Sequence, residues 1–319
     1  MHVEAHDLVK TYPSDVRALD GLSLGIERGE IFGLLGPNGA GKSTAIKILT
    51  TLARPDSGAA TVAGHDVLRD PDRVRRVIGV VAQRSGADPM ATGRDNLMLQ
   101  GRLYGLGGAA LKRRVGELLD RFDLVVAADR AVKTYSGGMQ RRLDVALGLV
   151  HEPAVLFLDE PTTGLDPEAR AALWREIDRI ATHEGLTILL TTHYLEEADR
   201  LAARLAIVDS GRIVVTGTPD ALKGELKGDA VHAELRAMPD VPAVRRALGT
   251  VPGVREVSVA GRRLSARADD GAAAVPDVLA ALDRAGAPVA SVTVARPSLD
   301  DVYLRTVGHR YAETNNGAE

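Results

Sequence analysis

One nine-residue stretch constrains what this chain can fold into more than any other feature: Gly36-Pro37-Asn38-Gly39-Ala40-Gly41-Lys42-Ser43-Thr44. It matches the phosphate-binding loop G-x-x-x-x-G-K-[ST] at every fixed position. The apolar residues 30–35 before it predict a strand, and residues 45–49 after it begin a helical pattern. An ordinary glycine-rich turn would not need these two flanking elements. The stretch therefore predicts an α/β domain that binds a nucleoside triphosphate.

Each part of this loop has a chemical reason. Glycines let the backbone curl so that successive N–H groups point at a phosphate, and the following helix adds its positive N-terminal end. Lys42 can reach the β- and γ-phosphates, and the Ser43 hydroxyl can ligate a magnesium ion. We expect all nine residues, from Gly36 to Thr44, to contact the nucleotide.

Composition limits the setting in which this site works. A chain of 319 residues is long enough for about two domains. The net charge is −3, with basic residues spread along the chain, so we expect no nucleic-acid partner. The absence of cysteine excludes disulfides and fits a reducing cytoplasm. We expect no signal peptide, and no apolar run approaches the roughly 20 residues of a membrane-spanning helix. If the protein works at a membrane, another chain crosses it.

Hydrophobic patterning divides the chain in two. In the first part we expect strands at 3–9, 18–26, 60–63, 77–81, 154–160 and 186–191, a turn at 54–58, and a hairpin of 205–209 with 212–216. The helices expected there span 95–106, 109–122, 139–150, 168–184 and 195–201. We expect this nucleotide-binding domain to cover residues 1–225, with a helical subdomain at about 84–145.

The pattern of predicted strands and helices changes near residue 228. The order that follows is strand 230–236, helix 241–248, strands 254–260 and 264–268, helix 272–285 and strand 289–295. This βαββαβ order predicts a small ferredoxin-like α+β domain over 228–307, which an amphipathic stretch at 298–307 closes. We expect the tail, 308–319, to be disordered.

A second motif separates the many classes of phosphate-loop protein: Ser136-Gly137-Gly138-Met139-Gln140-Arg141-Arg142. Ser136 and the amides of Gly137 and Gly138 can form a second anion-binding site at a helix N-terminus. A serine-capped helix after a glycine turn is the simpler interpretation, but the phosphate loop upstream favours the functional one. The motif resembles the signature of ATP-binding cassette (ABC) ATPases. Tyr135 and Met139 depart from the usual residues, whereas the Ser-Gly-Gly core is intact.

The resemblance covers roughly residues 1–225 and implies a composite site. In the ABC family the signature of one protomer closes over the γ-phosphate held by the loop of another. The resemblance therefore implies a homodimer of ATPase subunits with ATP and Mg²⁺ bound between them. Thr163-Gly164-Leu165-Asp166 resembles the family's D-loop, so Asp166 is expected at that dimer interface.

Asp159-Glu160 resembles the family's Walker B end. Paired carboxylates on a loop are often only solvated, but here an apolar strand places them at its C-terminal edge, where α/β sites lie. The resemblance implies that Asp159, Ser43 and Gln83 hold magnesium. It also implies that Glu160 orients or deprotonates the attacking water.

Two further residues have family counterparts outside these motifs. His193 fits the switch histidine that contacts the γ-phosphate. A lone histidine at the end of a strand is more often structural. The distance of His193 downstream of Glu160, and the Leu195-Glu196-Glu197-Ala198 that follows it, favour the functional role. Tyr12 fits the ring that stacks on adenine, with a tyrosine in a proline turn as the alternative. The segment 84–96 after Gln83 is where the resemblance implies contact with a transmembrane partner.

Three kinds of ABC protein are compatible with these motifs. A soluble ABC ATPase acting on translation normally has two cassettes, and this chain has one. One acting on DNA carries a long coiled coil for which the short separation of Lys42 and Asp159 leaves no room. The C-terminal residues 296–305 and the stretch 192–199 resemble daunorubicin-resistance exporter ATPases, although cassettes for polysaccharide or nodulation-factor export have similar ends.

The exporter resemblance implies an activity and a place in the cell. It implies an ATP-hydrolysing subunit, peripheral at the cytoplasmic face of the membrane. This subunit would power efflux of a drug, antibiotic or lipid through a separate integral-membrane permease.

Overall fold

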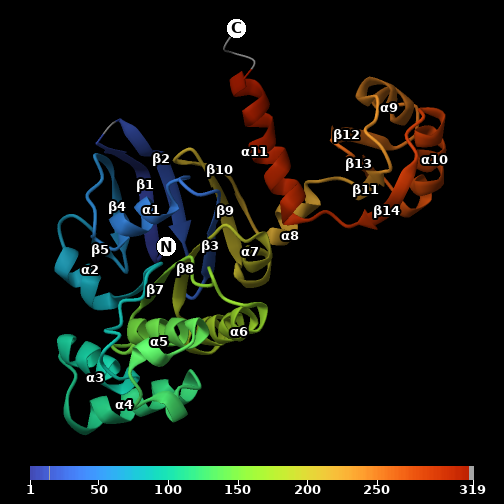
Figure 1. Ribbon diagram of the computed structural model, residues 1–319. Coiled ribbons are helices and arrows are strands. Elements are labelled where there is room, and N and C mark those ends of the chain that lie inside the picture. The colour runs from blue at the N-terminus through green and yellow to red at the C-terminus, as the bar shows by residue number, and fades with distance from the viewer. Residues whose placement is uncertain (14, 316–319) are drawn as a thin grey trace. The chain divides into compact units, whose positions relative to one another are not determined.

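The computed structural model describes residues 1–13 and 15–315, with side chains described as far as Val307 (Figure 1). The chain divides into two compact units, Met1–Pro219 and Asp220–Glu319. We expected the division slightly later, between residues 225 and 228. The α/β class and the additional small α+β domain are as predicted.

A six-stranded sheet forms the centre of the first unit, in the order β10-β9-β3-β8-β7-β6. These strands are β3 (Ile31–Leu35), β6 (Ile78–Val81), β7 (Val155–Asp159), β8 (Thr187–Thr192), β9 (Arg204–Asp209) and β10 (Arg212–Gly217). All neighbours are parallel except the β9–β10 hairpin. Strands β3 and β8 are buried along their whole length, as expected for a parallel sheet covered on both faces.

A second, antiparallel sheet has the order β2-β1-β4-β5. Its strands are β1 (Val3–Tyr12), β2 (Val16–Ile26), β4 (Ser57–Val62) and β5 (His65–Asp66). Strand β4 therefore begins inside the stretch where we expected only a turn. One hydrophobic core joins both sheets, since Val3 and Leu22 share it with Phe32 and Ile48.

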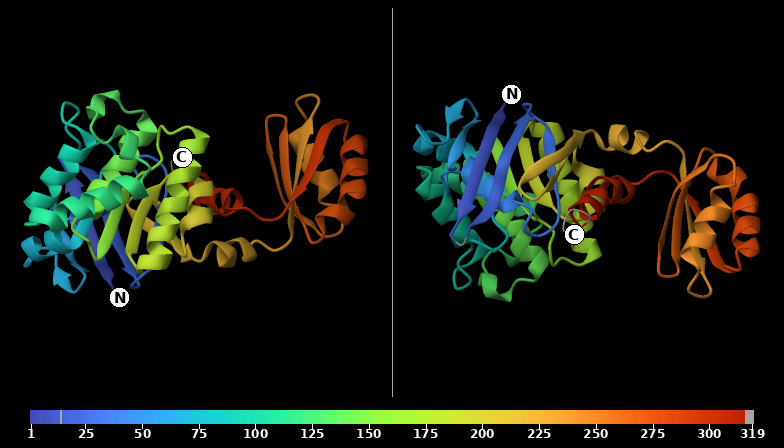
Figure 2. Two further views of the ribbon diagram at one scale, coloured as in Figure 1. Left: turned by 90° about the horizontal axis from the view of Figure 1, so that it is seen from below. Right: turned by 90° about the horizontal axis from the view of Figure 1, so that it is seen from above.

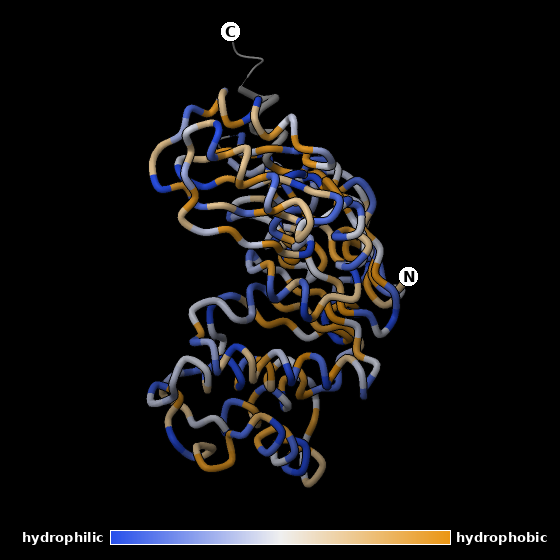
Figure 3. Tube along the Cα trace, turned by 90° about the vertical axis from the view of Figure 1, so that its right-hand side faces the viewer, coloured by the Kyte–Doolittle hydropathy of each residue, from blue (hydrophilic) through white to orange (hydrophobic). Residues whose placement is uncertain are grey.

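Helices surround the central sheet. They are α1 (Lys42–Leu49), α2 (Pro71–Val77), α3 (Gly93–Leu103), α4 (Gly108–Arg121), α5 (Gly137–Leu149), α6 (Pro167–Glu184) and α7 (Leu195–Leu201). Helix α8 (Pro219–Gly224) begins at the last residue of this unit and continues into the second. Helices α3, α4 and α5 form the predicted helical part (Figure 1) and share a core with β7 and β8. Hydrophobic and hydrophilic residues are interspersed along the chain (Figure 3). Within residues 1–13 and 15–315, no helix has the length and apolarity that a membrane span requires.

The second unit confirms the predicted βαββαβ order. It contains β11 (Asp229–Leu235), α9 (Val241–Leu248), β12 (Val254–Ala260), β13 (Arg263–Ala268), α10 (Gly271–Arg284) and β14 (Val289–Ala295). The sheet order is β12-β13-β11-β14, with every pair antiparallel. Helices α9 and α10 cover one face of this sheet (Figure 2) and bury Val244 and Val278 against it.

The last helix of the described chain continues past residue 307, into the stretch where disorder is expected. Helix α11 (Leu299–Asn315) runs through it, because no proline stops the helix and Gly308 costs only about 1 kcal/mol in a helix. Residues 316–319, which also belong to the expected tail, lie outside the described residues.

Candidate functional site

The phosphate-binding loop joins β3 to α1 and requires glycine at two positions for steric reasons. A Cβ on Gly36 would lie 2.3 Å from the carbonyl oxygen of Val208 in β9. Gly41 has a φ of +107°, and a Cβ there would lie 2.4 Å from the carbonyl oxygen of Ala18. The neighbouring strands thus hold the loop so closely that only glycine fits. Helix α1 then begins at Lys42, with its first amides beside the loop.

Lys42 is almost fully buried at the start of α1. Its Nζ donates hydrogen bonds to the carbonyl oxygens of Gly36, at 2.7 Å, and Pro37, at 3.0 Å. It also lies 3.5 Å from Glu160 Oε1. Burial lowers the pKa of Lys42, while the nearby carboxylates Glu160 and Asp159 oppose that shift. The ammonium group is therefore fixed beside the loop.

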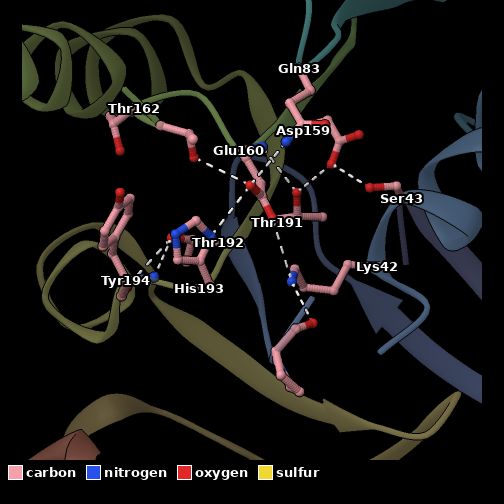
Figure 4. Close-up of polar contacts among 12 residues, drawn as sticks. Lys42, Ser43, Gln83, Asp159, Glu160, Thr162, Thr191, Thr192, His193 and Tyr194 are labelled. Atoms are coloured by element: carbon pink, nitrogen blue, oxygen red, sulfur yellow. Dashed lines mark hydrogen bonds and ion pairs between the residues drawn. The ribbon is translucent and has the colours of Figure 1, made fainter. Parts of the chain in front are cut away.

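Asp159 lies at the end of β7, next to the end of β8. The register pairs Asp159 with Thr191, and Thr191 Oγ1 donates to Asp159 Oδ1 at 2.7 Å. Ser43 Oγ donates to the same carboxylate oxygen at 3.1 Å. The hydroxyl of the phosphate loop and the carboxylate at the end of β7 thus meet at one point (Figure 4).

Glu160 is the next residue, and its backbone is strained. Its φ of +49° lies in the left-handed region, which non-glycine residues seldom adopt. The side chain is only 8% exposed. Its Oε2 accepts a hydrogen bond from Thr163 Oγ1 at 3.2 Å. It accepts another from Gln83 Nε2 at 3.4 Å (Figure 4). His193 Nδ1 lies 3.3 Å from the same oxygen without hydrogen-bond geometry.

Lys42, Ser43, Gln83 and Glu160 border a cleft of about 380 Å³. Val16, Ala18 and Glu160 line the cleft. The other lining residues are among those predicted to bind the nucleotide: Tyr12, Asn38, Gly39, Ala40, Gly41, Lys42, Ser43, Thr44 and Gln83. Tyr12 ends β1, and Lys10 Nζ lies 5.8 Å from the centre of its ring. The lining therefore combines an aromatic ring and apolar side chains with charged groups, which suits a base and its phosphates.

Eight predicted residues do not line this cleft: Gly36, Pro37, Ser136, Gly137, Gly138, Asp159, Asp166 and His193. Ser136 caps α5 and accepts a hydrogen bond from the amide of Met139 at 3.3 Å, and its side chain is exposed. Asp166 caps α6 and accepts from the amide of Ala169 at 2.9 Å. Within the single chain, the residues around Ser136 and Asp166 therefore do not meet the phosphate loop at this cleft.

Sequence reasoning missed the threonines around the two carboxylates. Thr191 bonds to Asp159 and also accepts from the Glu160 amide at 3.1 Å. A strand ending near 191 was predicted, but nothing in chain order shows that β8 lies beside β7. Thr163 was noted only as part of the D-loop, although it bonds to Glu160.

Sequence profiles of two families match this chain. One is described as ABC transporter and covers residues 19–163. The other is the C-terminal domain of ATP-binding proteins like DrrA1-3 and covers residues 217–307. The first match spans the phosphate loop, the signature and Walker B, and the second spans the ferredoxin-like unit.

Curated relatives match over nearly their full length. The chain is 47% identical to the daunorubicin resistance ATP-binding protein DrrA2 of Streptomyces coeruleorubidus, covering 98% of this chain and 97% of that protein. It is 46% identical to the daunorubicin/doxorubicin resistance ATP-binding protein DrrA of Streptomyces peucetius, covering 96% and 92% respectively.

A solved structure extends the comparison to a nucleotide-bound state. It is a dimeric ATP-binding cassette in a post-hydrolysis state bound to ADP and Pi, with a TM-score of 0.63 and 26% identity. The match covers 68% of this chain and 98% of that one.

Proposed function

This chain belongs to the family of ABC transporter ATP-binding proteins, and we propose that it powers export of a drug, antibiotic or lipid through a separate integral-membrane permease. The observation that carries the proposal is the juxtaposition of Lys42 with Asp159 and Glu160 at one edge of the sheet. Such a site can bind a triphosphate and hydrolyse it. The resistance proteins that are similar along nearly the whole chain support a drug-type cargo.

ATP hydrolysis at this site would depend on the positions of charged groups around the phosphates. The amides of the phosphate loop and Lys42 would hold the β- and γ-phosphates, and Glu160 would orient or deprotonate the attacking water. His193, beside Glu160, would contact the γ-phosphate. Tyr12 would stack on the adenine ring.

Magnesium fits the oxygen atoms at this site. Ser43 and Asp159 present a hydroxyl and a carboxylate to one point, and magnesium prefers such hard oxygen ligands together with phosphates. Gln83 would complete the set, although its amide nitrogen bonds to Glu160 in this structure. The ion would neutralise charge that develops on the phosphates.

The remaining predicted residues support a homodimer. Ser136 and Gly137 are exposed at the N-terminus of α5, where amides and the helix dipole favour an anion. In a dimer they and Gly138 would close over the γ-phosphate held by the partner, with Asp166 at the interface. The dimeric cassette bound to ADP and Pi supports this arrangement.

The permease contact belongs to the segment after Gln83. Residues 84–86 and 88–90 are exposed, with Met90 at 68%. Because it is exposed, this segment is free to meet another protein. A subunit held there would lie peripherally at the cytoplasmic face of the membrane.

A transport assay tests the whole proposal. Cells expressing this chain with the membrane protein encoded beside it should extrude daunorubicin, whereas the Lys42→Ala chain with the same permease should not. Efflux of an oligosaccharide or lipid instead would change the cargo but keep the exporter. Co-purification with ribosomes or DNA, and with no membrane protein, would overturn the proposal in favour of a soluble non-transport ATPase.

A further inference from the structure

Helix α5 carries a buried arginine that no part of the proposed mechanism uses. Arg141 is 8% exposed. Its guanidinium donates hydrogen bonds to four main-chain carbonyl oxygens: Ala82 at 2.5 Å, Pro161 at 2.6 Å, Asp159 at 3.0 Å and Glu160 at 3.2 Å. Its neighbour Arg142 differs, since it forms an ion pair with the exposed Asp123 at 3.1 Å. An arginine that is buried and bonded only to backbone acts by holding that backbone.

The four carbonyls belong to two functional segments. Three of them belong to Glu160 and to the residues before and after it, Asp159 and Pro161. The backbone of Glu160 is strained, with a φ of +49°. A conformation of this kind persists only where the surroundings over-determine it. The planar guanidinium has five N–H donors in a rigid fork, so one group can hold the carbonyls on both sides of Glu160. Ala82, the fourth partner, directly precedes Gln83.

A second residue of α5 strengthens the link to the Gln83 loop. Asp144 accepts hydrogen bonds from Ser85 Oγ at 2.7 Å and from the Gly86 amide at 3.3 Å. It also lies 3.9 Å from Arg141, which partly compensates the buried charge. Burial raises the pKa of Asp144. Two residues one helical turn apart thus hold the segment 82–86.

We propose that Arg141 is a positioning residue for ATP hydrolysis. It fixes the Glu160 backbone and the start of the Gln83 loop to the helix that begins at the signature. The inference rests on the catalytic role proposed for Glu160. A movement of the segment 84–96, where the permease contact is proposed, would reach Glu160 through this arginine. None of the hydrogen bonds of Arg141 goes to the phosphate loop, so ATP binding does not depend on it directly.

Steady-state kinetics and equilibrium ATP binding of the full chain test this inference. For Arg141→Gln we expect kcat to fall roughly 10- to 100-fold, as when a catalytic group is displaced by about 1 Å. Its KM and Kd for ATP should stay within about threefold of the original chain, because an interaction made only in the transition state is lost. Arg141→Lys should be intermediate, since one ammonium cannot bond to both segments. If Arg141→Gln does not fold, the kcat-to-KM split of Arg141→Lys decides.

Arg114 offers a matched structural control. It is half-buried in α4 and donates to the carbonyl oxygen of Leu149, at the other end of α5, at 2.8 Å. Arg114→Gln should lower stability while keeping kcat within about twofold, because it does not touch Glu160. The inference is overturned if Arg141→Gln keeps its kcat, if kcat and ATP affinity fall in parallel, or if Arg114→Gln loses the same activity.

Glu160→Gln separates the inference from the function on which it rests. If that variant hydrolyses ATP normally, the proposed catalytic role fails and the positioning role fails with it. If Glu160→Gln is inactive while Arg141→Gln turns over normally, only the positioning role is overturned.

Discussion

At the scale of single residues, Glu160 combines a buried carboxylate, a strained backbone and contact with Lys42, Gln83 and Thr163. Glu160→Gln keeps the shape of the side chain and removes its charge. We expect kcat to fall by about 10²–10⁴, the usual contribution of a general base, with ATP affinity retained. ATP-bound dimers should then accumulate, as size-exclusion chromatography can measure. Normal turnover would remove Glu160 from the catalytic role, and Glu117→Gln on the exposed side of α4 is the control.

Lys42 and Lys47 make a matched pair, because both lie on α1 while only Lys42 is buried beside the phosphate loop. Lys42→Ala removes the ammonium that bonds to Gly36 and Pro37. We expect the Kd for ATP to rise at least about tenfold, since a charge-assisted hydrogen bond contributes about 1.5–3 kcal/mol. Lys47→Ala should bind ATP like the original chain. Equal affinities of the two variants, measured by calorimetry, would contradict the role of Lys42.

At the scale of elements, a buried carboxylate joins α7 to α6 and to the turn after Glu160. Glu197 is fully buried, and its Oε1 accepts from Thr162 Oγ1 and Trp174 Nε1, each at 2.8 Å. Thr162→Val removes one donor at nearly constant shape. We expect the free energy of unfolding of the first unit to fall by about 1–3 kcal/mol, the cost of a buried acceptor that loses a partner. Fluorescence of Trp174, the only tryptophan in the chain, reports this transition in urea. An unchanged midpoint would show that the hydrogen bond contributes no net stability.

At the scale of the whole molecule, each of the two units has its own hydrophobic core. Every residue that lines the nucleotide cleft lies in the first unit. We therefore expect a chain lacking residues 228–319 to bind ATP with a Kd within about twofold of the full chain. Calorimetry checks the affinity, and circular dichroism checks that the shortened chain is folded. A folded chain that no longer binds ATP would show that the second unit contributes to the site.

Features that depend on neighbours along the chain could be predicted from the sequence. The phosphate loop, the signature and the βαββαβ order were all recognisable, because loop chemistry and hydrophobic period are local properties. The family assignment that these motifs supported is confirmed by the matches along the chain. The roles assigned to individual site residues stay predictions, which the variants above test.

Contacts between segments far apart in the chain became visible only in the folded structure. Thr191 lies beside Asp159 because β8 pairs with β7, and Arg141 reaches the carbonyl of Glu160 because α5 packs beneath the turn that follows β7. Strand order and helix packing follow from burying apolar surface between segments far apart in the chain, which no local pattern encodes. The phosphate loop could be recognised from nine consecutive residues. The residues that hold Glu160 beside it could be identified only from the fold.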